Sequence, residues 1–124
     1  IQPLKQGNVS FMDGLVTIDT TGNVVVSGVL RAPKIETNQL IITTGNTDQA
    51  IGSGIIVAGE SSIDIPTTAL NLNSKIIVTF RHDITPATRY YVTGRQPGVS
   101  FRLMLDLPTE NDAEFDWIII EAKP

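Results

Sequence analysis

Apolar and polar residues alternate along much of this chain, and that period of two restricts its possible folds more than any other feature. Leucine or phenylalanine occupies every second position from Phe101 to Leu107. Side chains of a strand point alternately to its two faces, so such a run predicts a strand with one buried and one wet face. No window of a dozen residues keeps helical apolar spacing without interruption by glycine, proline or β-branched residues. We therefore predict an all-β protein.

A turn-rich stretch, Thr-Gly-Asn-Thr-Asp at 44–48, divides the chain into two parts. We predict a shaft or trimerisation segment at 1–48 and a head domain at 49–124. A chain of 124 residues buries only about two-thirds of its unfolded surface when it folds as one domain. Either part alone is therefore small for an independent core.

The first part contains two imperfect copies of a short unit. Gly-Asn-Val at 7–9 returns at 22–24, and each copy runs through a β-prone stretch to another glycine, Gly14 or Gly28. Gly-Asn tolerates a positive φ in a tight turn, so each unit predicts one short strand and one reversal. A lone ribbon of such strands is marginal in water, whereas stacking on neighbouring units or on identical chains buries its apolar face.

The second part has the pattern of a compact antiparallel domain. The stretches 55–57 and 63–65 flank a medium loop and predict a hairpin. The clearest central strand is 75–80, and 90–92 predicts a short edge strand. The last strand, 115–120, is apolar at most positions, so we expect burial on much of both its faces. Short strands at this spacing predict a small β-sandwich or jelly-roll.

Charge and composition exclude several classes of function. Only 18% of the residues are charged and the formal charge is −4, whereas nucleic-acid binding relies on clustered lysine and arginine. We therefore expect no nucleic-acid partner. The absence of cysteine excludes disulfides, thiolate catalysis and cysteine-bound zinc.

No apolar run approaches the roughly 20 residues of a membrane-spanning helix, so we expect no membrane insertion. The first residue is Ile1 rather than methionine, and no signal peptide is recognisable. We therefore expect a processed product or a fragment of a longer chain.

The segment 7–42 resembles the shaft repeats of phage tail fibres and related microbial surface fibres. Its core at 15–30, Leu-Val-Thr-Ile-Asp-Thr-Thr-Gly-Asn-Val-Val-Val-Ser-Gly-Val-Leu, has the Ile-Asp-x-x-Gly-Asn pattern, a hydrophobic triplet and another glycine. Downstream, 74–79 and 115–118 are similar to strands in the globular tips of such fibres. With barely two shaft repeats, the chain departs from a long fibre and has only a short shaft or connector.

The resemblance implies three parallel chains wound together, with apolar residues of each meeting on the axis. We therefore expect a homotrimeric structural component, together with other fibre subunits, outside the cell or on a virion surface. The predicted shaft is an intertwined β-helix or β-spiral. The residues predicted to form trimer contacts are Val16, Ile18, Val24, Val26, Leu30, Ile35, Leu40 and Ile42.

A second interpretation is a head that binds a glycan or protein receptor. Arginine and tyrosine are favoured at binding surfaces because they offer large area, stacking and directional donors. The candidate ligand-binding residues are Arg81, Arg89, Tyr90, Tyr91 and Arg95. The alternative is that these arginines, with Arg102, pair with Asp83, Asp106 and the acidic residues at 110–116 across strands or between subunits.

Catalytic and metal-binding patterns are weak. His82 and Asp83 are half of an acid/base pair, but no nucleophile motif accompanies them, so we predict no catalytic residues and no cofactor. Carboxylates at 110, 112, 114 and 116 lack the spacing of an EF-hand, and we predict no metal site. Trp117 lies in an apolar run, which favours a place in the core or in a subunit contact over sugar stacking.

Overall fold

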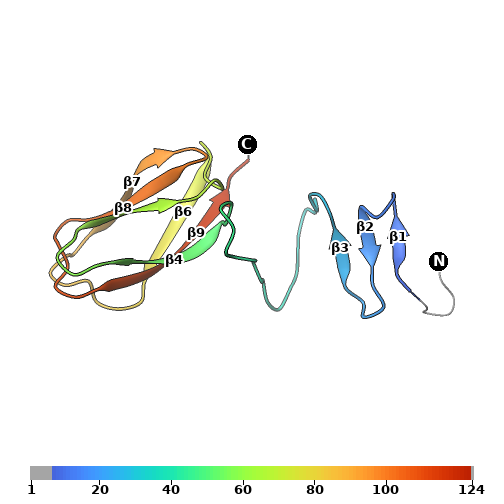
Figure 1. The fold of residues 1–124 in the computed structure, drawn as a ribbon, viewed down its shortest axis with the longest axis horizontal. Helices are drawn as coiled ribbons and strands as arrows, with labels where there is room; N and C mark the ends of the chain where they lie inside the picture. Colours follow the sequence, from blue (N-terminus) through green and yellow to red (C-terminus); the bar gives the residue numbers. More distant parts are fainter. Residues whose placement is uncertain (1–6, 124) are drawn as a thin grey trace. The chain divides into compact units, whose positions relative to one another are not determined.

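The computed structural model describes residues 7–123, and this part of the chain is all β (Figure 1). Its strands are β1 (Val9–Phe11), β2 (Val16–Ile18), β3 (Val24–Val26), β4 (Ile51–Ile56), β5 (Ser62–Pro66), β6 (Ser74–Phe80), β7 (Tyr90–Gln96), β8 (Ser100–Leu105) and β9 (Ala113–Glu121). No helix occurs in the described part, so none there has the length and apolarity to cross a membrane. The expectation of a processed or cut chain rests on Ile1, and this residue lies outside the described residues.

The strands form three antiparallel sheets of three strands each, with the orders β1-β2-β3, β4-β9-β6 and β5-β8-β7. This confirms the all-β fold class. The chain divides into two compact units, Ile1–Leu40 and Ile41–Pro124, with the first sheet in the first unit. Within residues 7–123 the first unit is a three-stranded meander, and no solenoid is present. The intertwined shaft stays a prediction about assembled chains.

Tight reversals set the register of the first sheet. Between β1 and β2, Met12, Asp13 and Gly14 all have positive φ, and the Gly14 amide donates to the Phe11 carbonyl at 3.2 Å. Between β2 and β3, Gly22 has a φ of 91°, a conformation that glycine adopts without steric cost. These reversals pair Val16 with both Phe11 and Val26.

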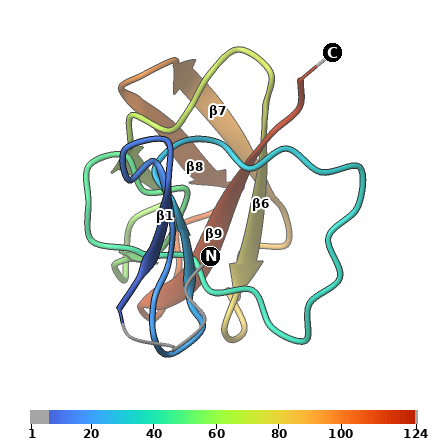
Figure 2. The ribbon, with the colours of Figure 1, turned by 90° about the vertical axis from the view of Figure 1, so that its right-hand side faces the viewer.

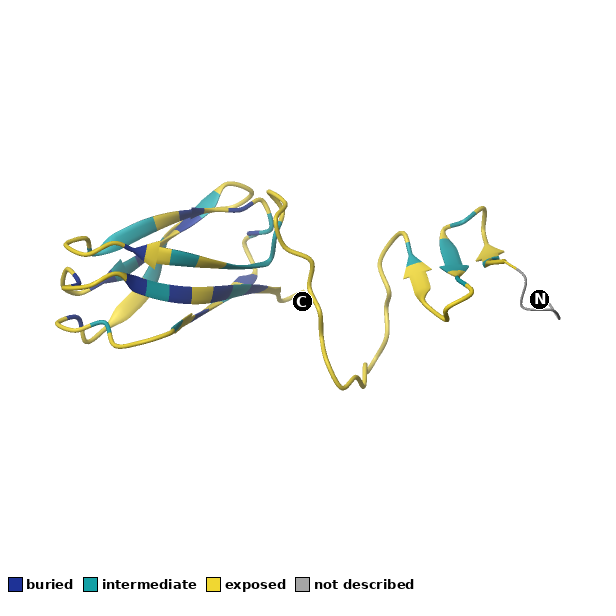
Figure 3. Cartoon of the chain, turned by 60° about the horizontal axis from the view of Figure 1, so that its bottom comes forward, coloured by how far each residue is buried: buried dark blue, intermediate teal, exposed yellow. Residues whose placement is uncertain are grey.

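The second unit consists of two sheets (Figures 1 and 2). The two sheets share one hydrophobic core. Phe101 and Leu103 of β8 are buried, as are Phe115 and Trp117 of β9. The rings of Phe101 and Trp117 meet edge to face across the sheets, with centroids 5.6 Å apart. Buried and exposed residues alternate along these strands, as Figure 3 shows, because each strand turns one face to the core.

Two glycines of β4 make room for the largest core side chains. Gly52 pairs with Trp117 and Gly54 pairs with Phe115 on the neighbouring strand β9. A Cβ added at Gly54 would lie 2.5 Å from the Phe115 ring, and one at Gly52 would lie 2.7 Å from the indole. Each aromatic ring therefore packs against bare backbone, and a side chain at either position would have to displace it.

The hairpin predicted from 55–57 and 63–65 is wrong. β4 pairs with β9 and β5 pairs with β8, so the intervening loop passes from one sheet to the other. The prediction for the last strand is also wrong in part. Phe115, Trp117 and Ile119 are buried, but Ile120 on the opposite face of β9 is 50% exposed.

We expect Gly54→Ala to destabilise the second unit by about 1–3 kcal/mol, because the added methyl group overpacks the Phe115 ring. Urea unfolding followed by the fluorescence of the single tryptophan, Trp117, measures the change. Gly28→Ala is the control, since nothing lies within 4 Å of a Cβ at that position. Equal stability of the Gly54 variant and the parent would contradict the close packing.

Candidate functional site

One face of the first sheet is apolar throughout. The register places six side chains on it, two from each strand: Val9, Phe11, Val16, Ile18, Val24 and Val26. The opposite face carries Ser10, Thr17 and Val25. The apolar side chains are exposed or half-buried, with Phe11 49% and Val24 61% exposed. An apolar sheet face of this kind is a candidate contact surface.

The structure brings together four of the predicted trimer-contact residues. Val16, Ile18, Val24 and Val26 lie on this apolar face, side by side across β2 and β3. Val9 and Phe11 extend the same face, and sequence reasoning missed them. The alternation Val-Ser-Phe at 9–11 is the signal that identifies them, although it covers only three residues.

The other four predicted contact residues lie outside the strands. Leu30, Ile35, Leu40 and Ile42 belong to the segment 27–50, where no strand is assigned. All four side chains are exposed. The structure therefore gives these residues no common face within one chain.

The reversal between β2 and β3 is closed by the side chain of Asp19. Its Oδ1 accepts hydrogen bonds from the backbone amides of Thr21 and Asn23, both at 2.9 Å, and from the Thr21 hydroxyl at 2.7 Å. The Asn23 amide group donates to Oδ2 at 2.7 Å. These donors, the Thr21 hydroxyl first, hold the pKa of the Asp19 carboxyl well below its usual range. The carboxylate therefore stays charged to a lower pH than an ordinary aspartate.

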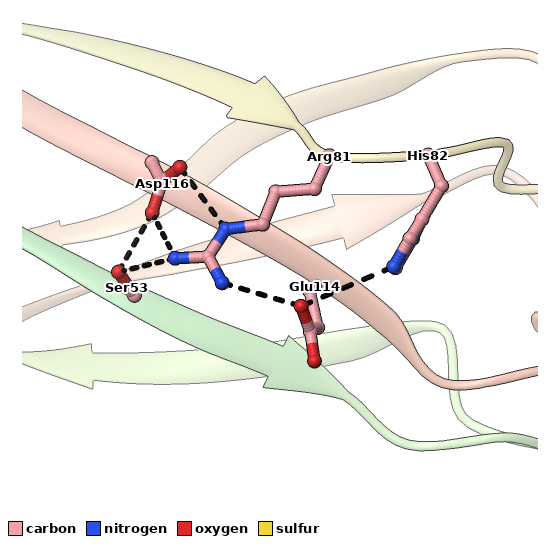
Figure 4. A network of polar contacts seen from close by, with 5 residues as sticks. All are labelled: Ser53, Arg81, His82, Glu114 and Asp116. Atoms are coloured by element: carbon pink, nitrogen blue, oxygen red, sulfur yellow. Dashed lines mark hydrogen bonds and ion pairs between the residues drawn. The ribbon is translucent and has the colours of Figure 1, made fainter.

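The predicted ligand-binding residues do not form one patch. Arg81 lies on the outer face of the sheet β4-β9-β6, where its guanidinium donates to Asp116 at 2.7 Å and to Glu114 at 3.2 Å (Figure 4). It also donates to the Ser53 hydroxyl at 3.1 Å. The Arg81 guanidinium, followed by the Ser53 hydroxyl, lowers the pKa of Asp116 to about 2.

Two other members of the predicted patch form hydrogen bonds between the two sheets of the second unit. The Tyr90 hydroxyl donates to the Val78 carbonyl of β6 at 3.2 Å, and the Tyr90 ring meets Phe80 edge to face at 5.2 Å. Arg95 donates to the Ser74 carbonyl at 2.9 Å. Both side chains thus reach from β7 to backbone oxygens of β6, which protects an otherwise open edge.

Arg89 and Tyr91 remain at the surface. Together with Thr88, Tyr90 and Asp106 they line an open hollow beside the start of β7. Asp106 accepts from the backbone amides of Thr88 and Arg89 and from the Thr88 hydroxyl. The backbone amide of Arg89, and then the Thr88 hydroxyl, lower the pKa of Asp106 to about 2. The Arg89 side chain is 83% exposed, and its Nε is 3.8 Å from Asp106.

The remaining candidates have structural partners. The Asp83 carboxylate accepts from the amide and hydroxyl of Thr85, while the nearest carboxylate to His82 is Glu114, at 4.0 Å. Among residues 7–123, no group of three histidine, aspartate or glutamate side chains is arranged to hold a metal ion. Trp117 is 2% exposed, which confirms its place in the core.

Comparison of the chain with models of protein families, with curated proteins and with solved structures finds no match. Its function is therefore inferred from its own residues and geometry.

We expect Asp19→Ala to open the β2–β3 reversal, because the backbone amides of Thr21 and Asn23 lose their acceptor. Hydrogen exchange measured by NMR should show that both amides lose most of their protection. Thr20→Ala is the matched control, since Thr20 lies in the same turn but outside the hydrogen-bonded set. Unchanged protection at both amides in the Asp19 variant would contradict this role.

Proposed function

We propose that this chain is a structural component of a homotrimeric fibre on a virion or cell surface. Residues 1–48 form the shaft and trimerisation segment, and residues 49–124 form a β-sandwich head. The observation that carries the proposal is the uncovered apolar face of β1-β2-β3. The role is mechanical and needs no catalytic residue, cofactor or metal.

A sheet of this size requires a second layer. Each of its strands has only three residues, and small sheets are stable only when an apolar face is packed against another element. Full burial of one valine, isoleucine or phenylalanine side chain contributes about 1.5–3 kcal/mol. Identical chains supply this layer symmetrically, because each copy offers the same apolar face.

The narrowness of the sheet favours packing around an axis. A strand of three residues spans about 10 Å, at about 3.3 Å per residue. Because β1, β2 and β3 are neighbours in chain order, the meander advances in one direction at right angles to its strands. Three such narrow faces turned to a common axis leave little of the apolar surface in water. The number three rests on the resemblance to fibre shafts.

The segment after β3 fits the same arrangement. Between 29 and 42 it carries six large aliphatic side chains, all of them exposed: Val29, Leu30, Ile35, Leu40, Ile41 and Ile42. A segment of this length without strands is uncommon in a compact domain. In the assembled fibre, neighbouring chains cover these side chains and pair with the backbone.

We expect Val16→Lys to abolish assembly, because a charge is then placed in the centre of the shared core. Sedimentation or light scattering should give about three times 13.4 kDa for the parent chain and one chain mass for the variant. Thr17→Lys is the matched control, because Thr17 lies in the same strand on the opposite face and should retain the trimer. A monomeric parent chain would refute the fibre proposal.

A second candidate function, compatible with the first, is attachment to a glycan or protein receptor through the head. The observation that favours it is the hollow lined by Arg89, Tyr90, Tyr91 and Asp106. Arg89 is highly exposed in an otherwise acidic chain, and the exposed ring of Tyr91 offers a surface for stacking. Arg81 and Arg95 do not line the hollow. The Arg81 guanidinium donates to Asp116, and the Arg95 guanidinium donates to the Ser74 carbonyl.

We expect the head to bind members of a glycan array that contains neutral and acidic glycans, and the double variant Arg89→Ala, Tyr91→Ala to lose that binding. Thr93→Ala is the control, because it lies farther along β7 and outside the hollow. Binding that survives in the double variant would exclude the hollow as the attachment site.

A further inference from the structure

The outer face of the sheet β4-β9-β6 carries a row of isoleucines. The register aligns Ile51, Ile118 and Ile77 across all three strands. Ile120 lies on the same face next to Ile118 along β9. Ile77 is 51% exposed and Ile120 is 50% exposed, while Ile51 and Ile118 are half-buried. A contiguous apolar row that spans a whole sheet differs from the single exposed aliphatic residues of an ordinary surface.

The outer face of the other sheet provides an internal comparison. Across β5-β8-β7, one aligned row on the outer face consists of Asp64, Arg102 and Thr93. Arg102 forms a bidentate ion pair with Asp64, with contacts of 2.7 and 2.8 Å. This row is polar and charged, in contrast to the isoleucine row on the outer face of β4-β9-β6.

The polar residues beside the isoleucine row satisfy one another. Ser53, Arg81, Glu114 and Asp116 form a connected set of hydrogen bonds and ion pairs on this face (Figure 4). Such a set next to an apolar strip has the composition of a protein interface, with an apolar centre and a polar rim.

The charges of this face balance. Lys75 and Arg81 contribute two positive charges, and Glu114 and Asp116 contribute two negative charges, so the formal sum is zero. The whole chain has a formal charge of −4. Identical heads therefore approach one another through this face without the repulsion that opposes contact elsewhere, and each face offers both signs to its neighbour.

We propose that the outer face of β4-β9-β6, centred on Ile77 and Ile118, is the contact between heads of neighbouring copies of this chain. The inference rests on the proposed trimer and adds a second contact region, separate from the shaft. When this face is turned towards the three-fold axis, the same residues of all three copies lie around that axis, and the isoleucine rows meet there.

The absence of cysteine allows a direct test on the full chain. Single variants Ile77→Cys and, separately, Ile120→Cys place a thiol on the proposed contact, and Thr93→Cys places one on the opposite outer face as the matched control. Maleimide labelling under native conditions measures thiol accessibility, light scattering measures the mass, and Trp117 fluorescence verifies that each head is folded. We expect labelling at Ile77→Cys and Ile120→Cys to be about tenfold or more slower than at Thr93→Cys, because it requires local opening.

The outcomes separate this inference from the fibre proposal. Slow labelling at both proposed positions in an oligomer supports the head contact. Labelling as fast as at Thr93→Cys, in a chain that is still trimeric, overturns the head contact and leaves the shaft-based trimer intact. A monomer overturns both proposals.

Discussion

A sheet that is apolar on one face must have that face covered, and this requirement organises the whole chain. In the second unit the two sheets cover each other, and Phe101, Phe115 and Trp117 fill the space between them. In the first unit the described residues supply one layer only, and the faces of β1, β2 and β3 remain exposed or half-buried. The second unit thus has a closed core of its own, whereas the apolar face of the first sheet is uncovered within the described residues.

Much of the fold was predictable because alternation records which face a residue occupies. The period of two identified the β class, the apolar face that Val16 and Val26 share, and the buried side of β8. It does not record which strand becomes the neighbour. The loop between β4 and β5 has the length of a hairpin connection, yet it crosses between sheets, and β4 pairs instead with β9, whose two aromatic rings pack on its glycines. Nor does an apolar run show whether both its faces are covered, as Ile120 demonstrates.

The candidate ligand site was predictable only in part, because closeness in sequence is not closeness on a surface. Arg81 follows β6 in one sheet, whereas Arg89 and Tyr91 lie at the start of β7 in the other. Tyr90 and Tyr91 point to opposite faces of β7, and the alternation with Val92 places Tyr90 on the core side. The bonds from Tyr90 and Arg95 to β6 carbonyls depend on how the sheets pack, which sequence spacing does not contain.

The turn at Asp19 is complete within five consecutive residues, since all its hydrogen bonds join positions 19 to 23. A reversal whose hydrogen bonds are all local forms without contacts from distant parts of the chain. Tandem copies of such a reversal add to one another without altering the geometry of those already present. The length of a shaft built this way is then open to change by duplication or deletion of whole units, while its cross-section stays the same.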